Sequence, residues 1–157
     1  MVDLHVNPFE RFNRDWALVT AGTPDHFNSM TISWGSMGTV WSKPVITVYV
    51  RPDRYTWKFI KENPYFTVSF YPAAQREALG VMGTLSGRDT DKIRKAGLTP
   101  QEVPNGMSFA EAEQTFACRK IYMNQMNFDE VPPEAKQIYQ NGIQPHYLII
   151  GEVTDVI

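Results

Sequence analysis

Residues 27–34 read FNSMTISW and alternate between polar and apolar side chains. An alternation with a period of two indicates a β-strand that has one face in a core and one face outside it. The two predicted faces carry Met30, Ile32 and Trp34 on the core side and Ser29, Thr31 and Ser33 on the polar side. We therefore expect this strand to set the arrangement of its neighbours.

Similar runs along the chain predict further strands. Residues 16–21 (WALVTA) are apolar and lead into the turn GTPD, so we expect them to form an antiparallel hairpin with residues 27–34. Residues 45–51 are rich in β-branched side chains and lie between two prolines. Further strands are predicted at residues 65–71, 115–127 and 146–157, the last with a bend or bulge at Gly151.

Short helices are expected between these strands. They are predicted at residues 54–62 with Asp53 as N-cap, at 72–82, at 89–96 with Gly97 as C-cap, and at 133–140. Residues 98–113 show no clear pattern. A sheet of six or seven twisted strands tends to curl and close. The sequence therefore predicts a mainly β protein, a small β-barrel with short helical insertions, in which residues 1–157 form one domain.

The composition is that of an ordinary globular protein, with 43% hydrophobic and 20% charged residues. A net charge of −2 argues against nucleic acid or an anionic membrane as partner. Residues 1–10 show no signal-peptide pattern, and no apolar run approaches the roughly 20 residues of a membrane helix. The single cysteine, Cys118, is interpreted as a buried thiol, and no Cys/His spacing suggests a metal site. We expect a cytoplasmic protein without a metal.

Three polar clusters are candidates for a binding site, since the GxSxG, HExxH and Walker motifs are absent. Residues 28–33 offer donors and acceptors that suit a flavin ring edge and its ribityl hydroxyls, although an ordinary solvent-facing strand has the same pattern. Residues 51–56 (RPDRYT) lie where a strand passes into a helix, and a helix N-terminus beside arginines suits a phosphate. Residues 86–92 (SGRDTDK) are either a second anion-binding turn or a capped surface helix.

The order of these clusters resembles the flavin reductase-like, FMN-binding split-barrel family, in its flavoredoxin-like branch. The resemblance runs from about residue 16 to residue 156. Its pieces are WALVTAG, NSMTISW at 28–34, a strand that begins Lys-Pro and ends Val-Arg-Pro at 50–52, Tyr-Thr at 55–56, SGRDTDK at 86–92, and HYLIIGEV at 146–153.

The resemblance implies a homodimer that holds FMN non-covalently near the subunit interface. The residues that it assigns to the flavin ring and ribityl chain are Asn28, Ser29, Met30, Thr31, Ser33 and Trp34. Those assigned to the phosphate end are Arg51, Tyr55 and Thr56, and those that close over the cofactor are Ser86, Gly87, Arg88 and Lys92. His146 is placed on the substrate side, close to the flavin, or else it only begins the last strand.

The implied function is that of an FMN-binding oxidoreductase, a flavin reductase that takes hydride from NADH or NADPH. No protein acid or base is assigned, because the flavin carries the chemistry. A flavoredoxin-like electron carrier with a redox protein partner and a flavin-binding module without turnover are the alternatives. Residues 144–146 read QPH where better-characterised reductases have Gly-Asp-His, which argues against nicotinamide contact there. Residues 122–142 carry no functional pattern and are expected to shape the substrate side.

Overall fold

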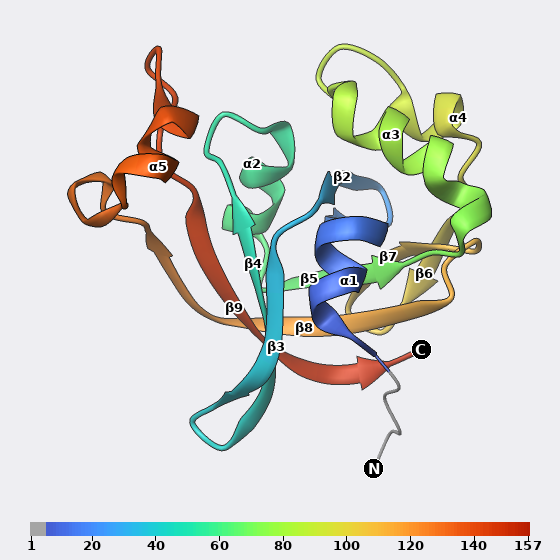
Figure 1. The fold of residues 1–157 in the computed structure, drawn as a ribbon. Helices are drawn as coiled ribbons and strands as arrows, with labels where there is room; N and C mark the ends of the chain where they lie inside the picture. The colour runs from blue at the N-terminus through green and yellow to red at the C-terminus, as the bar shows by residue number, and fades with distance from the viewer. Residues whose placement is uncertain (1–5) are drawn as a thin grey trace.

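The computed structural model describes residues 6–157 and shows a curled antiparallel sheet with short helices around its rim (Figure 1). Residues 1–5, which include half of the segment inspected for a signal peptide, lie outside the described part. The mainly β prediction is confirmed. The strands are β1 (Ala17–Thr23), β2 (His26–Ile32), β3 (Gly35–Val40), β4 (Lys43–Val50), β5 (Tyr65–Phe70), β6 (Pro100–Val103), β7 (Gly106–Phe109), β8 (Gln114–Gln125) and β9 (Tyr147–Val156).

Chain connectivity closes the main sheet into a split barrel. Seven strands follow the order β2-β1-β5-β8-β9-β4-β3, so β2 and β3 form opposite edges. Only Ser33 and Trp34 join these two edge strands along the chain. Because two residues span only a few ångströms, the sheet must curl until its edges meet. The remaining pair, β6-β7, forms a separate hairpin.

Short helices pack on both faces of this sheet. They are α1 (Pro8–Glu10), α2 (Tyr55–Glu62), α3 (Arg76–Thr84), α4 (Lys92–Ala96) and α5 (Pro133–Lys136). The predicted inward residues of α2, Trp57, Phe59 and Ile60, are buried in the barrel core with Met30 and Ile32 of β2. Helix α3 packs on the other face of the sheet, where Leu79 and Met82 meet Leu18 of β1. Strand β2 therefore lies between α2 and α3.

Four details differ from the sequence-based predictions. Trp34 does not share the core face of Met30, because β2 ends at Ile32, and its side chain is 40% exposed. Asp53 is not the N-cap of α2; Arg54 holds that position without a side-chain bond. The helix expected at 89–96 begins only at Lys92, with Asp91 as N-cap. Residues 98–113, left unassigned, form β6 and β7.

Strand β3 was also missed, because its sequence SMGT and its turn carry weak signals. The turn residues Trp41 and Ser42 have φ values of 50° and 59°. Two-residue hairpin turns that need positive φ at both positions usually carry Asn-Gly or a similar pair. A Trp-Ser turn gives no such indication, so neither the turn nor the edge strand before it stands out in the sequence.

Gly151 of β9 lies at a closely packed place in the barrel wall. The predicted irregularity is present, but the extra residue is Ile121 of β8, since Lys120 pairs with Gly151 and Tyr122 with Ile150. A Cβ on Gly151 would lie 2.5 Å from the Phe66 ring and 2.6 Å from the Cβ of Cys118. The glycine is therefore required by packing.

Replacing Gly151 by alanine should destabilise the protein by about 1–3 kcal/mol, because the added methyl group overpacks a closed core. Urea unfolding monitored by tryptophan fluorescence measures the change. Gly38→Ala is the matched control, since a Cβ on this strand glycine would meet nothing within 4 Å. Equal stability of the two variants would contradict the packing argument.

Candidate functional site

The three polar clusters come together around a small cavity, which we call the β2–α2 cavity. It is lined by Asn28 and Met30 of β2, by Asp53, Arg54, Tyr55 and Thr56 at the start of α2, by Gly83–Ser86 after α3, and by Lys92 of α4. Its volume is about 160 Å³. Cavities that enclose a whole organic ligand measure about 300–1,000 Å³. The β2–α2 cavity can therefore hold only one end of a nucleotide-sized molecule.

A hydrogen bond across this cavity fixes β2 against α2. The side-chain amide of Asn28 donates to the hydroxyl of Thr56 at 2.8 Å, and both residues are almost fully buried. Gly87 approaches the same amide so closely that a Cβ there would collide with the Asn28 side-chain oxygen. The arginine that follows, Arg88, lies over the Tyr55 ring at 5.1 Å. The turn at 86–88 thus covers one side of the cavity and needs its glycine.

Two cations give the cavity a positive character. The ammonium of Lys92 donates to the carbonyls of Met82 and Leu85 at 3.0 and 3.3 Å, and only 3% of this residue is exposed. Burial and the neighbouring Arg54 lower the pKa of Lys92 to about 8. Burial also lowers the pKa of Arg54, whose guanidinium donates to the carbonyl of Gly83 at 3.2 Å.

This donor set suits an anion with several oxygens. An ammonium has three donor hydrogens, and the hydroxyls of Thr56 and Ser86 and the first N–H groups of α2 add further donors at the lining. An anion beside Lys92 and Arg54 would offset the burial of both cations and the repulsion that Arg54 exerts on Lys92. Among the described residues, no cluster of His, Cys, Asp and Glu could hold a metal ion. The cavity thus has the chemistry of a phosphate site.

Several of the residues predicted from sequence lie outside the lining of this cavity. The Ser29 hydroxyl pairs with Thr20 at 2.8 Å inside the sheet, and the Thr31 hydroxyl donates to the carbonyl of Leu79 at 2.5 Å. Arg51 pairs with Asp53 at 3.1 Å and is not in the lining, whereas Arg54 is. Arg54 is within the RPDRYT cluster, so the sequence indicated the segment that reaches the cavity.

Trp34 and His146 lie together on the far side of the 51–54 loop. Their rings are 4.6 Å apart, and the Tyr139 hydroxyl meets Nδ1 of His146 at 2.7 Å. Burial and the positive charge of Arg51 lower the pKa of His146 to about 4. The imidazole is therefore neutral at pH 7. The charges of Arg51, Asp53 and Arg54 all affect the pKa of His146. The loop at residues 51–54 therefore lies near His146, and its Asp53 and Arg54 also line the β2–α2 cavity.

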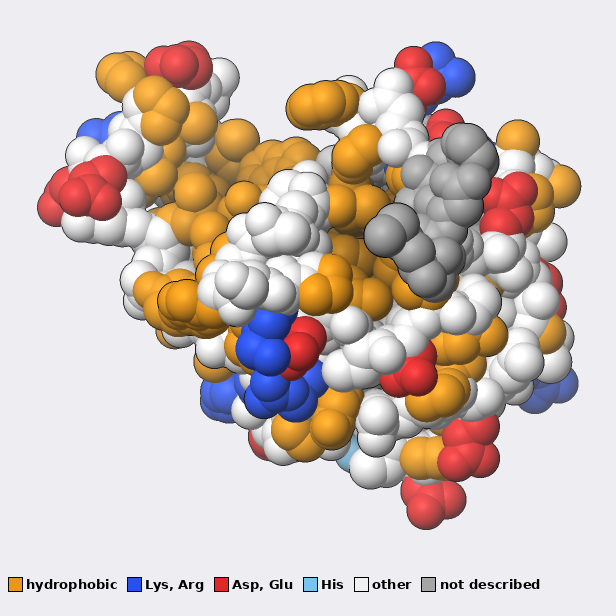
Figure 2. Space-filling view, turned by 90° about the horizontal axis from the view of Figure 1, so that it is seen from below, with side chains coloured by type: hydrophobic (Ala, Val, Ile, Leu, Met, Phe, Trp, Pro, Cys, Tyr) orange, Lys and Arg blue, Asp and Glu red, His pale blue; other side chains and the backbone are white. Residues whose placement is uncertain are grey.

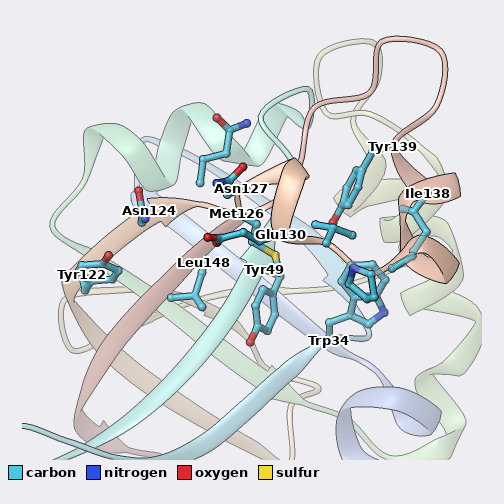
Figure 3. A pocket seen from close by; sticks show the side chains of 14 residues that line it. Trp34, Tyr49, Tyr122, Asn124, Met126, Asn127, Glu130, Ile138, Tyr139 and Leu148 are labelled. Carbon is cyan, nitrogen blue, oxygen red and sulfur yellow. The ribbon is translucent and has the colours of Figure 1, made fainter.

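A second, larger cavity opens beside Trp34 and Tyr139, and we call it the α5 cavity (Figure 3). Its volume is about 680 Å³, and its lining comes from β4, β8, β9 and residues 126–139. Figure 3 shows Trp34, Ile138 and Tyr139 on one side and Tyr122 on the other, with Tyr49 and Leu148 between them. Sequence reasoning named no residue in 122–142, because these side chains meet only through the fold.

Thr56→Val tests the hydrogen bond that crosses the β2–α2 cavity. Valine keeps the shape of threonine but leaves the buried Asn28 amide without its partner, which should cost about 1–3 kcal/mol of stability. Thr56→Ser keeps the hydroxyl and should lose less than half of that amount. Chemical unfolding of both variants measures the difference, and an equal loss in the two variants would show that the hydroxyl contributes no more than the methyl group.

Residues 9–157 match the model of the flavin reductase like domain. No curated protein sequence matches the chain. The flavoredoxin of Desulfovibrio vulgaris (Miyazaki F) has a similar structure, with a TM-score of 0.69 and 26% identity over 90% of this chain and 68% of that chain.

Two further structures show the same fold at lower identity. An FMN-binding protein from Thermus thermophilus, solved with bound 1-cyclohex-2-enone, has a TM-score of 0.72 and 19% identity, over 100% of this chain and 80% of that one. The FMN-binding domain of a flavin reductase-like enzyme from Shewanella baltica has a TM-score of 0.69 and 21% identity, over 95% and 71% of the two chains. With the domain match over residues 9–157, the chain belongs to the flavin reductase-like family.

Proposed function

We propose that this protein binds FMN non-covalently, with the phosphate in the β2–α2 cavity. The observation that carries the proposal is the convergence of three separate sequence clusters on one buried cavity with two cations, Lys92 and Arg54, at its lining. Similar structures from Shewanella baltica and Thermus thermophilus are FMN-binding proteins. The family membership and the donor set therefore agree on the same ligand.

Different residues would contact different parts of FMN. Lys92, Arg54, Thr56 and Ser86 would hold the phosphate, because they donate at the cavity. Asn28 and Met30 line the same cavity and would contact the chain next to the phosphate. The remaining predicted contacts would have to come partly from backbone groups, since the hydroxyls of Ser29 and Thr31 already have partners.

We further propose an oxidoreductase that takes hydride from NADH or NADPH. Bound FMN supplies the hydride-accepting and electron-transferring chemistry. The protein supplies position and electrostatics: the two cations hold the anionic end, and neutral His146 offers a hydrogen-bonding group beside Trp34 without adding charge. No acid or base from the protein is required for this reaction class.

A specific observation favours an electron carrier as the second candidate. Among the described residues, Glu130 is the only charged side chain that lines the α5 cavity, so residues 6–157 supply no cation there for the phosphates of a dinucleotide. A flavoredoxin is among the similar structures. A carrier would hold FMN and exchange electrons with a redox protein, and it would need no nicotinamide site.

The proposal includes a homodimer in the cytoplasm. Large hydrophobic side chains outside the lining of the α5 cavity are exposed at Phe9, Trp41, Phe128 and Ile157. Figure 2 shows hydrophobic side chains over much of one face, with charged side chains in small groups. Exposed apolar area of this kind is typical of an association surface. Within residues 6–157, no helix is long and apolar enough to cross a membrane.

Lys92→Met should weaken FMN binding at least ten-fold, because hydrogen bonds to charged groups contribute about 1.5–3 kcal/mol. Riboflavin, which lacks the phosphate, is the internal control: its affinity should change little, so the preference for FMN over riboflavin should shrink. Flavin fluorescence quenching measures both constants. An unchanged preference would remove Lys92 from the phosphate site.

The pH dependence of FMN affinity should reflect the protonation of Lys92. The pKa of Lys92 is lowered to about 8, so its charge is present at neutral pH and is lost as the pH rises through that value. The phosphate is fully ionised from about pH 7 upward, since its second pKa is about 6. FMN affinity should therefore fall above pH 8 in the wild-type protein and stay flat in Lys92→Met.

Turnover distinguishes the two candidate functions. Steady oxidation of NADH or NADPH with added FMN, measured by loss of nicotinamide absorbance, is expected for the reductase. A yellow protein that dithionite reduces, but that neither nicotinamide reduces, would contradict the reductase and support the carrier.

A further inference from the structure

The α5 cavity has walls that suit a flat apolar molecule. Four aromatic side chains, Trp34, Tyr49, Tyr122 and Tyr139, contribute to its lining, and Figure 3 shows Trp34 and Tyr139 on one side, Tyr122 on the other and Tyr49 between them. Aliphatic side chains from residues 131, 138 and 148 fill the space between them. Aromatic walls of this kind favour a ring that can pack against them with its face or edge.

The charge of the lining excludes another class of ligand. Among residues 6–157, Glu130 is the only charged residue there, and no Lys, Arg or His side chain contributes. Moving an anion from water into surroundings without a counter-charge is unfavourable. A ligand that carries phosphate, sulfonate or carboxylate groups into the cavity would meet the carboxylate of Glu130 and no cation from these residues.

We propose that the α5 cavity binds an uncharged, flat ring compound. Its volume of about 680 Å³ lies within the range of about 300–1,000 Å³ that small-molecule sites show. A few polar groups are present to orient such a ring. The Tyr139 hydroxyl is fixed by His146 at 2.7 Å and has a further hydrogen-bonding position, and Asn124 and Asn127 add carboxamides to the lining.

The α5 cavity is connected to the β2–α2 cavity through His146 and the 51–54 loop. Trp34 and Tyr139 line the cavity and also contact His146. His146 in turn lies near the 51–54 loop, whose Asp53 and Arg54 line the β2–α2 cavity. The role of the ring compound as a second substrate rests on the proposed function, whereas its binding does not depend on FMN.

A pair of probes with the same ring tests the proposal. 2-Naphthol is uncharged at neutral pH, and naphthalene-2-sulfonate is an anion of the same ring system. Isothermal titration calorimetry should show that 2-naphthol binds at least ten-fold more tightly than the sulfonate, with and without saturating FMN. Ala135→Phe, which fills the cavity, should weaken 2-naphthol binding at least ten-fold and leave FMN affinity unchanged.

Ala74→Phe is the matched control, because it places the same side chain at an exposed position away from this cavity. Ile138→Glu is a second cavity variant, used if Ala135→Phe folds poorly, and it should weaken 2-naphthol binding as well. Circular dichroism and FMN affinity verify that each variant is folded. A wild-type protein that binds 2-naphthol but not FMN would refute the proposed function but not this inference.

Three results would overturn the inference. The first is equal affinity for the two probes, and the second is naphthol binding that both cavity variants leave unchanged. The third is the absence of saturable naphthol binding, together with a shift from dimer to monomer in Ala135→Phe by analytical ultracentrifugation. That result would assign the cavity to the contact between two copies of this chain.

Discussion

Strand β2 is fixed on both faces by hydrogen bonds from its own polar side chains, and the positions of both neighbouring helices depend on them. Asn28 reaches Thr56 of α2 on the barrel side, and Thr31 reaches the Leu79 carbonyl of α3 on the outer side. Each such bond contributes only about 0.5–1.5 kcal/mol net, but a buried partner left without it costs more. The strand thereby sets the distance between the two helix termini that enclose the β2–α2 cavity.

The positive charge of that cavity is maintained against an electrostatic penalty. Burial and the charge of Arg54 lower the pKa of Lys92, and burial and the charge of Arg51 lower the pKa of Arg54. Carbonyls at the C-terminal end of α3 partly compensate, because that helix end carries partial negative charge. Two neighbouring cations with lowered pKa values in a cleft are a physical indication of a binding site for an anion.

Most of the fold could be predicted from the sequence, because periodicity and turn residues are local signals. The β1–β2 hairpin, β4, β5, β8 and β9 all appear where alternation or β-branched runs predict them. Trp34 was misplaced because the alternation continues for two residues beyond the end of the strand. The clusters of the β2–α2 cavity could be identified because each has a short motif. The contacts of His146 with Trp34 and Tyr139 could not be predicted from the sequence, since they depend on the closure of the barrel.

The close packing around Gly151 also determines the chemistry of the single cysteine in the sequence. Cys118 is fully buried beside that glycine, and burial raises the pKa of its thiol to about 12. Since the thiolate is the form that attacks electrophiles and reacts with peroxides, the protonated Cys118 thiol is unreactive in the folded state. A cysteine introduced on the surface could accordingly be labelled selectively in the otherwise native protein, and labelling of Cys118 itself would report unfolding of the barrel wall.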